Sequence, residues 1–174
     1  VRSPDGAVVE SVLLEDANGR KTACLSSQVG CAMGCSFCRT AEMGLKRNLS
    51  AGEIVEQLLH LQDRYGKIDN AVFMGMGEPL ANLGELRRSI ELISHPEGLG
   101  WSLRRITVST CGLVRPIRDL AGKGPGVRLA LSLITTDQAL REELMPAAKG
   151  NPLPRLAEAL AAYRDAHKRR ITLE

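Results

Sequence analysis

The sequence lacks any apolar run near the ~18 residues that a membrane-spanning helix needs, and residues 1–6 do not resemble a signal peptide. We therefore expect no membrane association. Internal repeats and low-complexity segments are also absent, which argues against a repeat array. With 174 residues, of which 44% are hydrophobic and 25% charged, the composition is ordinary for a globular protein with one sizeable core.

Charge and cysteine content narrow the class of protein further. A net charge of +3 is weakly basic, which is compatible with an RNA partner but does not indicate one. The five cysteines are odd in number and clustered, unlike the disulfide framework of a small secreted protein. We therefore expect a reducing, cytoplasmic location.

Three of the cysteines, Cys31, Cys35 and Cys38, lie within eight residues. Three thiolates on one short loop can bind three irons of a [4Fe-4S] cluster, which leaves the fourth iron without a protein ligand and open to chemistry. Gly30 and Gly34 favour this arrangement, because glycine adopts positive φ angles that let the loop turn its sulfurs inward. The spacing therefore predicts an iron-sulfur site.

Two other interpretations of these cysteines remain open. A structural zinc site needs four ligands, usually in two separated pairs, and the sequence offers no second Cys-x-x-Cys and no nearby histidine. Buried cysteines are common in protein cores, but three within eight residues, interleaved with glycine, are unusual there. The spacing favours the cluster over both.

Apolar periodicity and turn residues predict strands and helices in alternation. Asn18-Gly19 is a strong hairpin signal, and Ser50 with Glu53 forms a helix capping box. We expect hairpin strands at 7–15 and 20–27, helices at 50–65, 84–94, 116–121, 137–144 and from Pro154 onward, and strands at 71–74, 105–109, 127–133 and from Ile171 onward.

Such alternation indicates an α/β fold of parallel βα units with right-handed crossovers. About five units fit, fewer than in a full (β/α)₈ barrel of ~250 residues. We expect a β-hairpin at residues 1–27 that leads into a partial barrel at residues 28–174. Ligands bind at the carboxyl ends of strands in such folds. The loop that carries Cys31, Cys35 and Cys38, called here the cysteine loop, should therefore form one binding site with the segments 75–78, 109–112 and 132–135.

The motifs carry a family resemblance. Cys-Ala-Met-Gly-Cys-Ser-Phe-Cys at residues 31–38 resembles the signature of the radical S-adenosylmethionine (SAM) superfamily. With residues 26–31, 44–49 and 74–80, it resembles the RlmN/Cfr-like RNA methyltransferases, which methylate carbon 2 of adenine in large-subunit ribosomal RNA and in transfer RNA. The likeness covers nearly the whole chain. It implies a TIM-like partial (β/α)₆ barrel, truncated at its C-terminal end.

The resemblance also implies cofactors and their ligands. A [4Fe-4S] cluster bound by Cys31, Cys35 and Cys38 would be met by SAM at its open iron, and one electron would then release a 5′-deoxyadenosyl radical. The implied SAM contacts are Gly77, Glu78, Ser109, Ser132 and Leu133. Gly75-x-Gly77 alone is compatible with a dinucleotide-binding loop, but Glu78-Pro79 replaces the helix start and third glycine of that motif.

Cys24 lies seven residues before the cluster motif. Its pattern alone fits a core cysteine on a strand. The resemblance instead implies a catalytic role, in which a distal cysteine carries the methyl group to adenine and Cys24 resolves the protein–RNA adduct as a disulfide forms. No residue of this sequence matches the distal cysteine, and Cys111 lies too early in the chain to do so.

The sequence departs from the family pattern at one position. Where the family usually has histidine after Ser-Leu, this sequence has Ile134, which cannot donate a hydrogen bond from its side chain.

Three functional hypotheses follow from the sequence. The first hypothesis is an RNA methyltransferase that acts as a monomer on ribosomal and transfer RNA, with a reducing electron donor such as a flavodoxin. The second is another radical SAM enzyme with a different substrate. The third is a non-catalytic, zinc-binding module.

Overall fold

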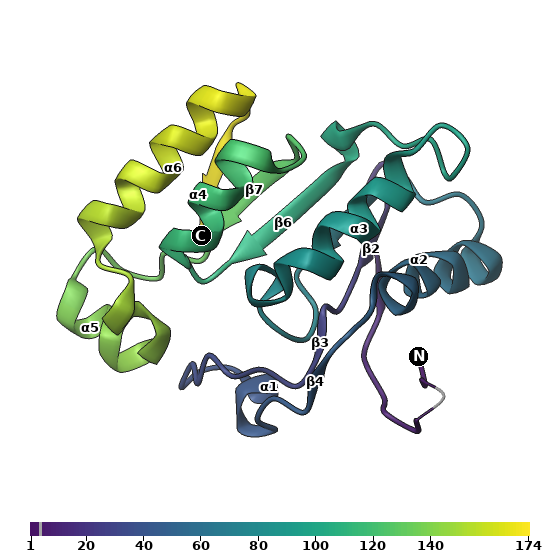
Figure 1. Ribbon diagram of the computed structural model, residues 1–174. Helices are drawn as coiled ribbons and strands as arrows, with labels where there is room; N and C mark the ends of the chain where they lie inside the picture. The colour runs from purple at the N-terminus through teal and green to yellow at the C-terminus, as the bar shows by residue number, and fades with distance from the viewer. Residues whose placement is uncertain (4) are drawn as a thin grey trace.

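The computed structural model describes residues 1–3 and 5–174 and is built around a six-stranded sheet (Figure 1). In spatial order the strands are β1 (Val12–Glu15), β2 (Lys21–Cys24), β5 (Asn70–Phe73), β6 (Ile106–Thr110), β7 (Arg128–Leu131) and β8 (Ile171–Leu173). β1 and β2 pair antiparallel as a hairpin, and every other neighbouring pair is parallel. β2 therefore belongs both to the hairpin and to the parallel part of the sheet.

The helices connect the parallel strands in chain order. They are α2 (Ala51–Tyr65), α3 (Leu83–Ser94), α4 (Val114–Lys123), α5 (Gln138–Leu144) and α6 (Leu153–His167). Because each new strand adds on the same side of the last, right-handed crossovers put the helices on one face of the sheet, and Figure 1 shows α2, α3, α4 and α6 there. This is the expected partial (β/α) barrel. No helix among the described residues is long and apolar enough to span a membrane.

Short elements fill the connections. They are α1 (Arg39–Glu42), the 3₁₀ helices η1 (Pro79–Asn82), η2 (Leu103–Arg105) and η3 (Pro146–Gly150), and a separate antiparallel ribbon of β3 (Gln28–Val29) with β4 (Arg47–Asn48). None of these was expected from the sequence. The ribbon brackets the cysteine loop and joins its two ends.

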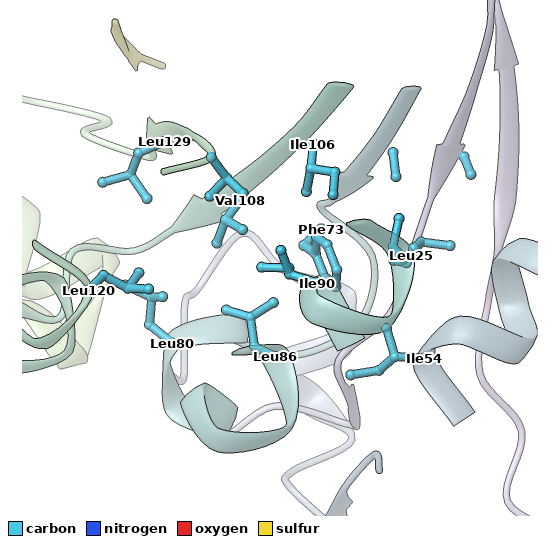
Figure 2. Close-up of a cluster of buried hydrophobic side chains, with 14 of the residues drawn as sticks. Leu25, Ile54, Phe73, Leu80, Leu86, Ile90, Ile106, Val108, Leu120 and Leu129 are labelled. Atoms are coloured by element: carbon cyan, nitrogen blue, oxygen red, sulfur yellow. The ribbon is translucent and has the colours of Figure 1, made fainter. Parts of the chain in front are cut away.

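The core lies between the sheet and its helices (Figure 2). Phe73, Ile106 and Val108 are fully buried and extend from β5 and β6 toward Leu86 and Ile90 of α3. Alternate residues of a strand point to opposite faces, so these side chains define the helix-covered face. The side chains of the intervening residues point to the opposite face of the sheet, called here the inner face.

The inner face carries half-buried residues of several strands. Cys24, Val72 and Thr107 are register partners across β2, β5 and β6, and Ser109 is the next inner-face residue of β6. Each alternates with a buried residue that faces the helices. Cys24 and Ser109 thus lie on the same side of the sheet, as residues of a barrel interior do.

Four predicted elements had bounds that were wrong by more than one residue. The hairpin strands expected at 7–15 and 20–27 are confined to β1 and β2, because after Cys24 the chain leaves the sheet and the Ser27 N–H donates to the Met76 carbonyl at 2.9 Å. The strand expected at 127–133 ends at Leu131, whose carbonyl accepts from the Leu133 N–H in a tight turn. The helix expected at 116–121 is the longer α4.

Candidate cofactor-binding site

A cavity of about 300 Å³ lies at the carboxyl ends of the parallel strands. Its walls come from the cysteine loop, the loop after β5, the end of β6 and the segment after β7, so the structure brings the four expected segments together. The cavity is lined by seven of the residues predicted to bind cofactors, which are Cys31, Cys35, Cys38, Gly77, Glu78, Ser109 and Ser132. Leu133 and Cys24 do not line it.

The cysteine loop is closed by backbone pairing at its base. Beyond the β3–β4 ribbon, the Cys31 N–H donates to the Gly44 carbonyl at 3.2 Å. Gly30 has a φ of 78°, and a Cβ at this position would lie only 1.8 Å from the Gly44 oxygen. Gly34 also has positive φ, at 70°. The expected backbone role of both glycines is confirmed, and only glycine fits at position 30.

Two of the three thiols, those of Cys31 and Cys35, lie in surroundings that disfavour their ionisation. Burial raises the pKa of Cys31 and of Cys35, and the neighbouring thiols of Cys31 and Cys38 raise the pKa of Cys35 further. Bound iron cations would instead lower the pKa of the thiols, because a metal binds the deprotonated thiolate. The donor set therefore fits a [4Fe-4S] cluster, in which each thiolate binds a different iron. Among the described residues, no three Cys, His, Asp or Glu side chains are gathered closely enough for a single metal ion.

Glu78 lines the cavity and is only 4% exposed. One carboxylate oxygen accepts from the Leu80 N–H at 3.0 Å and the other from the Cys111 N–H at 2.8 Å. Burial raises the pKa of Glu78, and these hydrogen bonds oppose the rise. Glu78 therefore ties the loop after β5 to the end of β6, and its remaining lone pairs can still accept from a ligand.

Gly77 lets this loop pass close to the cysteine ribbon. Its φ is 97°, and a Cβ there would lie 2.5 Å from the Gln28 Cβ. The Gln28 side chain in turn accepts from the Glu78 N–H at 2.9 Å. The bare backbone at position 77 is thus required by packing and also faces the cavity.

The segment after β7 differs from the expectation in one residue. Ser132 lines the cavity, whereas Leu133 packs against the core and does not reach it. The N–H groups of Leu133 and Ile134 both donate to the Glu174 carbonyl, at 2.8 and 3.0 Å. Ile134 has a φ of 67°, which is rare for a β-branched residue, and the residue is 44% exposed.

Cys24 lies outside the cavity wall, on the inner face of β2. It is half-buried. Burial raises the pKa of its thiol, and a hydrogen bond to the Met74 backbone lowers it. The geometry places Cys24 on the side of the sheet where a barrel holds its substrate, and its catalytic role stays a prediction.

Sequence reasoning missed Arg141 of α5. This arginine is fully buried and does not line the cavity; its Nη2 donates to the Cys111 carbonyl at 2.6 Å and its Nε to the Leu133 carbonyl at 3.2 Å. Arginine is almost never fully buried, so a charged residue in a seven-residue helix is expected at the surface. Nothing in the sequence pattern signals its burial.

Comparison with known proteins places the site in context. The sequence profile of the radical SAM superfamily matches residues 25–173. A probable dual-specificity RNA methyltransferase RlmN from Treponema pallidum is 52% identical over 166 residues, which cover 95% of this chain and 49% of that protein. A dual-specificity RNA methyltransferase RlmN from Syntrophobacter fumaroxidans is 50% identical over 173 residues, covering 98% and 50%.

The chain is also similar to a solved structure. The crystal structure of a radical SAM methyltransferase from Sphaerobacter thermophilus superposes with a TM-score of 0.94 at 43% identity, and the match covers 99% of this chain and 51% of that one. The chain spans about half the length of the curated relatives it matches.

Proposed function

Because this chain belongs to the radical SAM superfamily, we propose that Cys31, Cys35 and Cys38 bind a [4Fe-4S] cluster and that the adjoining cavity binds SAM. The observation that supports this most directly is that three thiols of one loop and the ends of β5, β6 and β7 line a single cavity. When bound, the cluster supplies the electron that cleaves SAM to a 5′-deoxyadenosyl radical.

The protein's own groups would orient the substrate for this step. The Glu78 carboxylate would accept from the ammonium group of SAM, while the bare backbone at Gly77 lets the amino acid end approach closely. The hydroxyl groups of Ser109 and Ser132 would hydrogen-bond the rest of the ligand. Leu133 would act only indirectly, by holding the neighbouring Ser132 in place, since its side chain packs into the core and the residue does not line the cavity.

For the complete reaction we propose methylation of carbon 2 of adenine in ribosomal and transfer RNA. The names of the relatives support RNA as the substrate, and the order of the motifs supports the specific chemistry. Cys24 would resolve a protein–RNA adduct, for which its place on the inner face is suitable. The proposal includes a reducing electron donor such as a flavodoxin, a monomeric state and a cytoplasmic location.

Ile134 supports a second candidate function. An isoleucine replaces the family's histidine beside Ser132 and Leu133, so a side-chain hydrogen bond to the cofactor is lost. This observation favours a radical SAM enzyme that uses the same cluster on another substrate. Both candidates share the cluster and the SAM site and differ in the substrate and therefore in the product.

Cluster reconstitution in cysteine variants tests the proposal. Anaerobically reconstituted protein should contain about four irons and about four acid-labile sulfides per chain, with Mössbauer spectra of a [4Fe-4S] cluster. Replacing Cys31, Cys35 or Cys38 by alanine should abolish the cluster, because each thiolate holds one iron. Cys24→Ala and Cys111→Ala are the matched controls and should retain it. A cluster that survives Cys35→Ala, or that is lost in Cys111→Ala, would refute the ligand assignment.

A further inference from the structure

We propose that Arg141 is a positioning residue for the cluster. It fixes the ends of β6 and β7, and it holds a positive charge without an anionic partner beside the cysteine loop. This charge makes the cluster easier to reduce. The inference rests on the proposed function, since it concerns the same cluster. It goes beyond that function by assigning a role to a residue outside the cavity wall.

The burial of Arg141 is complete, and its charge has no anionic partner among the described salt bridges. Its side chain is 0% exposed, and Nη1 is buried without any hydrogen-bond partner. None of the salt bridges in the described part of the chain involves Arg141. An isolated buried charge is costly, and a guanidinium does not give up its proton to avoid the cost. A nearby anion would therefore stabilise this arrangement.

The contacts that Arg141 does make join two strand ends. Nη2 donates to the carbonyl of Cys111, directly after β6, and Nε donates to the carbonyl of Leu133, after β7. The planar guanidinium presents these donors in a fixed fork, so one side chain sets the distance between the two segments. Cys111 and Ser132, which precedes Leu133, both line the cavity.

The same helix also supports the cysteine loop. The N–H of Ser36, between Cys35 and Cys38, donates to the Leu144 carbonyl at the end of α5 at 3.0 Å. Gly34 lies against Pro146, whose Cγ would be 3.5 Å from a Cβ at Gly34. The loop therefore rests on the helix that carries Arg141.

Electrostatics link Arg141 to the thiols. Burial lowers the pKa of Arg141, and the thiols of Cys111 and Cys35 oppose this by raising it. The groups that interact electrostatically with the guanidinium thus include a proposed cluster ligand. A [4Fe-4S]²⁺ cluster with three thiolates has a net charge of about −1, which becomes about −2 when a low-potential reductant donates one electron. A fixed cation nearby stabilises the more negative state.

The test is a redox titration of the SAM-free, cluster-loaded chain with dithionite, followed by electron paramagnetic resonance. At the midpoint potential of the unmodified protein, Arg141→Gln should lower the ratio of reduced to oxidised cluster at least about tenfold, which is ~59 mV for a one-electron couple. Arg141→Lys keeps the charge and should change the ratio less than about threefold. Arg88→Gln removes the same charge from a 74% exposed position and should change nothing.

The outcomes separate the inference from the proposed function. A full cluster with unchanged potential in Arg141→Gln would overturn the role of the charge, and so would an equal shift in the lysine and glutamine variants. If the glutamine variant does not fold, the lysine variant decides, because a tenfold shift there contradicts the proposal and a retained potential supports it. Failure of the unmodified chain to bind any cluster would overturn the proposed function itself, and this inference with it.

Discussion

At the scale of single residues, Glu78 combines a structural role with a proposed role in binding SAM. Its two oxygens accept from backbone N–H groups of two different segments, and the same residue lines the cavity. A substitution here removes support for the loop after β5 as well as the proposed ligand contact. Loss of binding and loss of stability therefore have to be measured separately.

Glu78→Ala should weaken SAM binding roughly tenfold to a hundredfold, since a charge-assisted hydrogen bond contributes about 1.5–3 kcal/mol. It should also lower the free energy of unfolding by at least about 1 kcal/mol, because two buried N–H groups lose their acceptor. Iron content should stay unchanged. Equilibrium binding, denaturant unfolding and iron analysis measure the three effects.

Glu78→Gln is the matched control, because its amide oxygen can still accept from one N–H while the charge is gone. We expect it to retain more stability than Glu78→Ala but to bind SAM as weakly. Unchanged SAM affinity in both variants would show that the carboxylate serves packing alone.

Ile134 is the second informative residue, because its backbone adopts a left-handed conformation that costs an L-residue roughly 1–2 kcal/mol. Asparagine and histidine tolerate this region better than isoleucine. Ile134→His should therefore stabilise the fold by a few tenths to ~1 kcal/mol and tighten SAM binding, since it restores the family's side chain. Thermal unfolding and equilibrium binding check the two effects.

Ile134→Asn separates strain from ligand contact. It should give a similar gain in stability without the imidazole. If both variants tighten SAM binding equally, the backbone conformation and not the histidine side chain controls affinity. If neither does, position 134 has no part in the cofactor site.

At the scale of elements, the cysteine loop is fastened to α2 through the β3–β4 ribbon. Arg47 of β4 pairs with Glu53 in the first turn of α2, with two hydrogen bonds of 2.8 and 2.9 Å, and with Asp5 at 2.7 Å. Glu53 also completes the capping box with Ser50. One carboxylate thus holds the end of the cysteine loop and the start of a helix.

This pairing should make stability depend on pH. The hydrogen bonds from Arg47 lower the pKa of Glu53 from its ordinary value of 4.5 to about 2. The unfolded chain then binds this proton more tightly than the folded one, so the stabilisation is complete above pH ~4.5 and is lost as the pH falls toward 2. Glu53→Gln should lower the free energy of unfolding at pH 7 and have less effect at pH 3, measured by urea unfolding.

Glu56→Gln, at an exposed position of the same helix, is the control and should leave the pH profile unchanged. A difference between Glu53→Gln and the unmodified protein that is equal at pH 7 and pH 3 would contradict the ionic role of Glu53. The capping box alone would then account for its contribution.

Regular elements were the part of the fold that the sequence predicts well. Apolar periodicity placed α2 and α3 within a residue of their observed bounds, because each buries one stripe of side chains against the sheet. The β3–β4 ribbon was missed, since its Gln28 and Asn48 show no apolar alternation and are joined only by tertiary pairing. Arg141 was missed for a similar reason, as its burial depends on distant strand ends.

At the scale of the whole molecule, the two parts of the proposed reaction, radical generation and methyl transfer, need different residues. The proposed cluster ligands and SAM contacts lie between residues 31 and 133, and most of them line one cavity. The resemblance also implies a methyl-carrying cysteine, and none of the five cysteines in this sequence matches it. Radical generation and methyl transfer should therefore depend on different parts of the protein.

We accordingly expect the reconstituted and reduced chain to release slow, uncoupled 5′-deoxyadenosine from SAM and to form no 2-methyladenine in ribosomal or transfer RNA. Mass spectrometry of the small products and of digested nucleosides measures both. Cys35→Ala, which should lack the cluster, is the control for the first product. Formation of 2-methyladenine would show that Cys24 or Cys111 carries the methyl group, whereas a full cluster without any 5′-deoxyadenosine would locate the defect in SAM binding, where Ile134 is the first residue to revert to histidine.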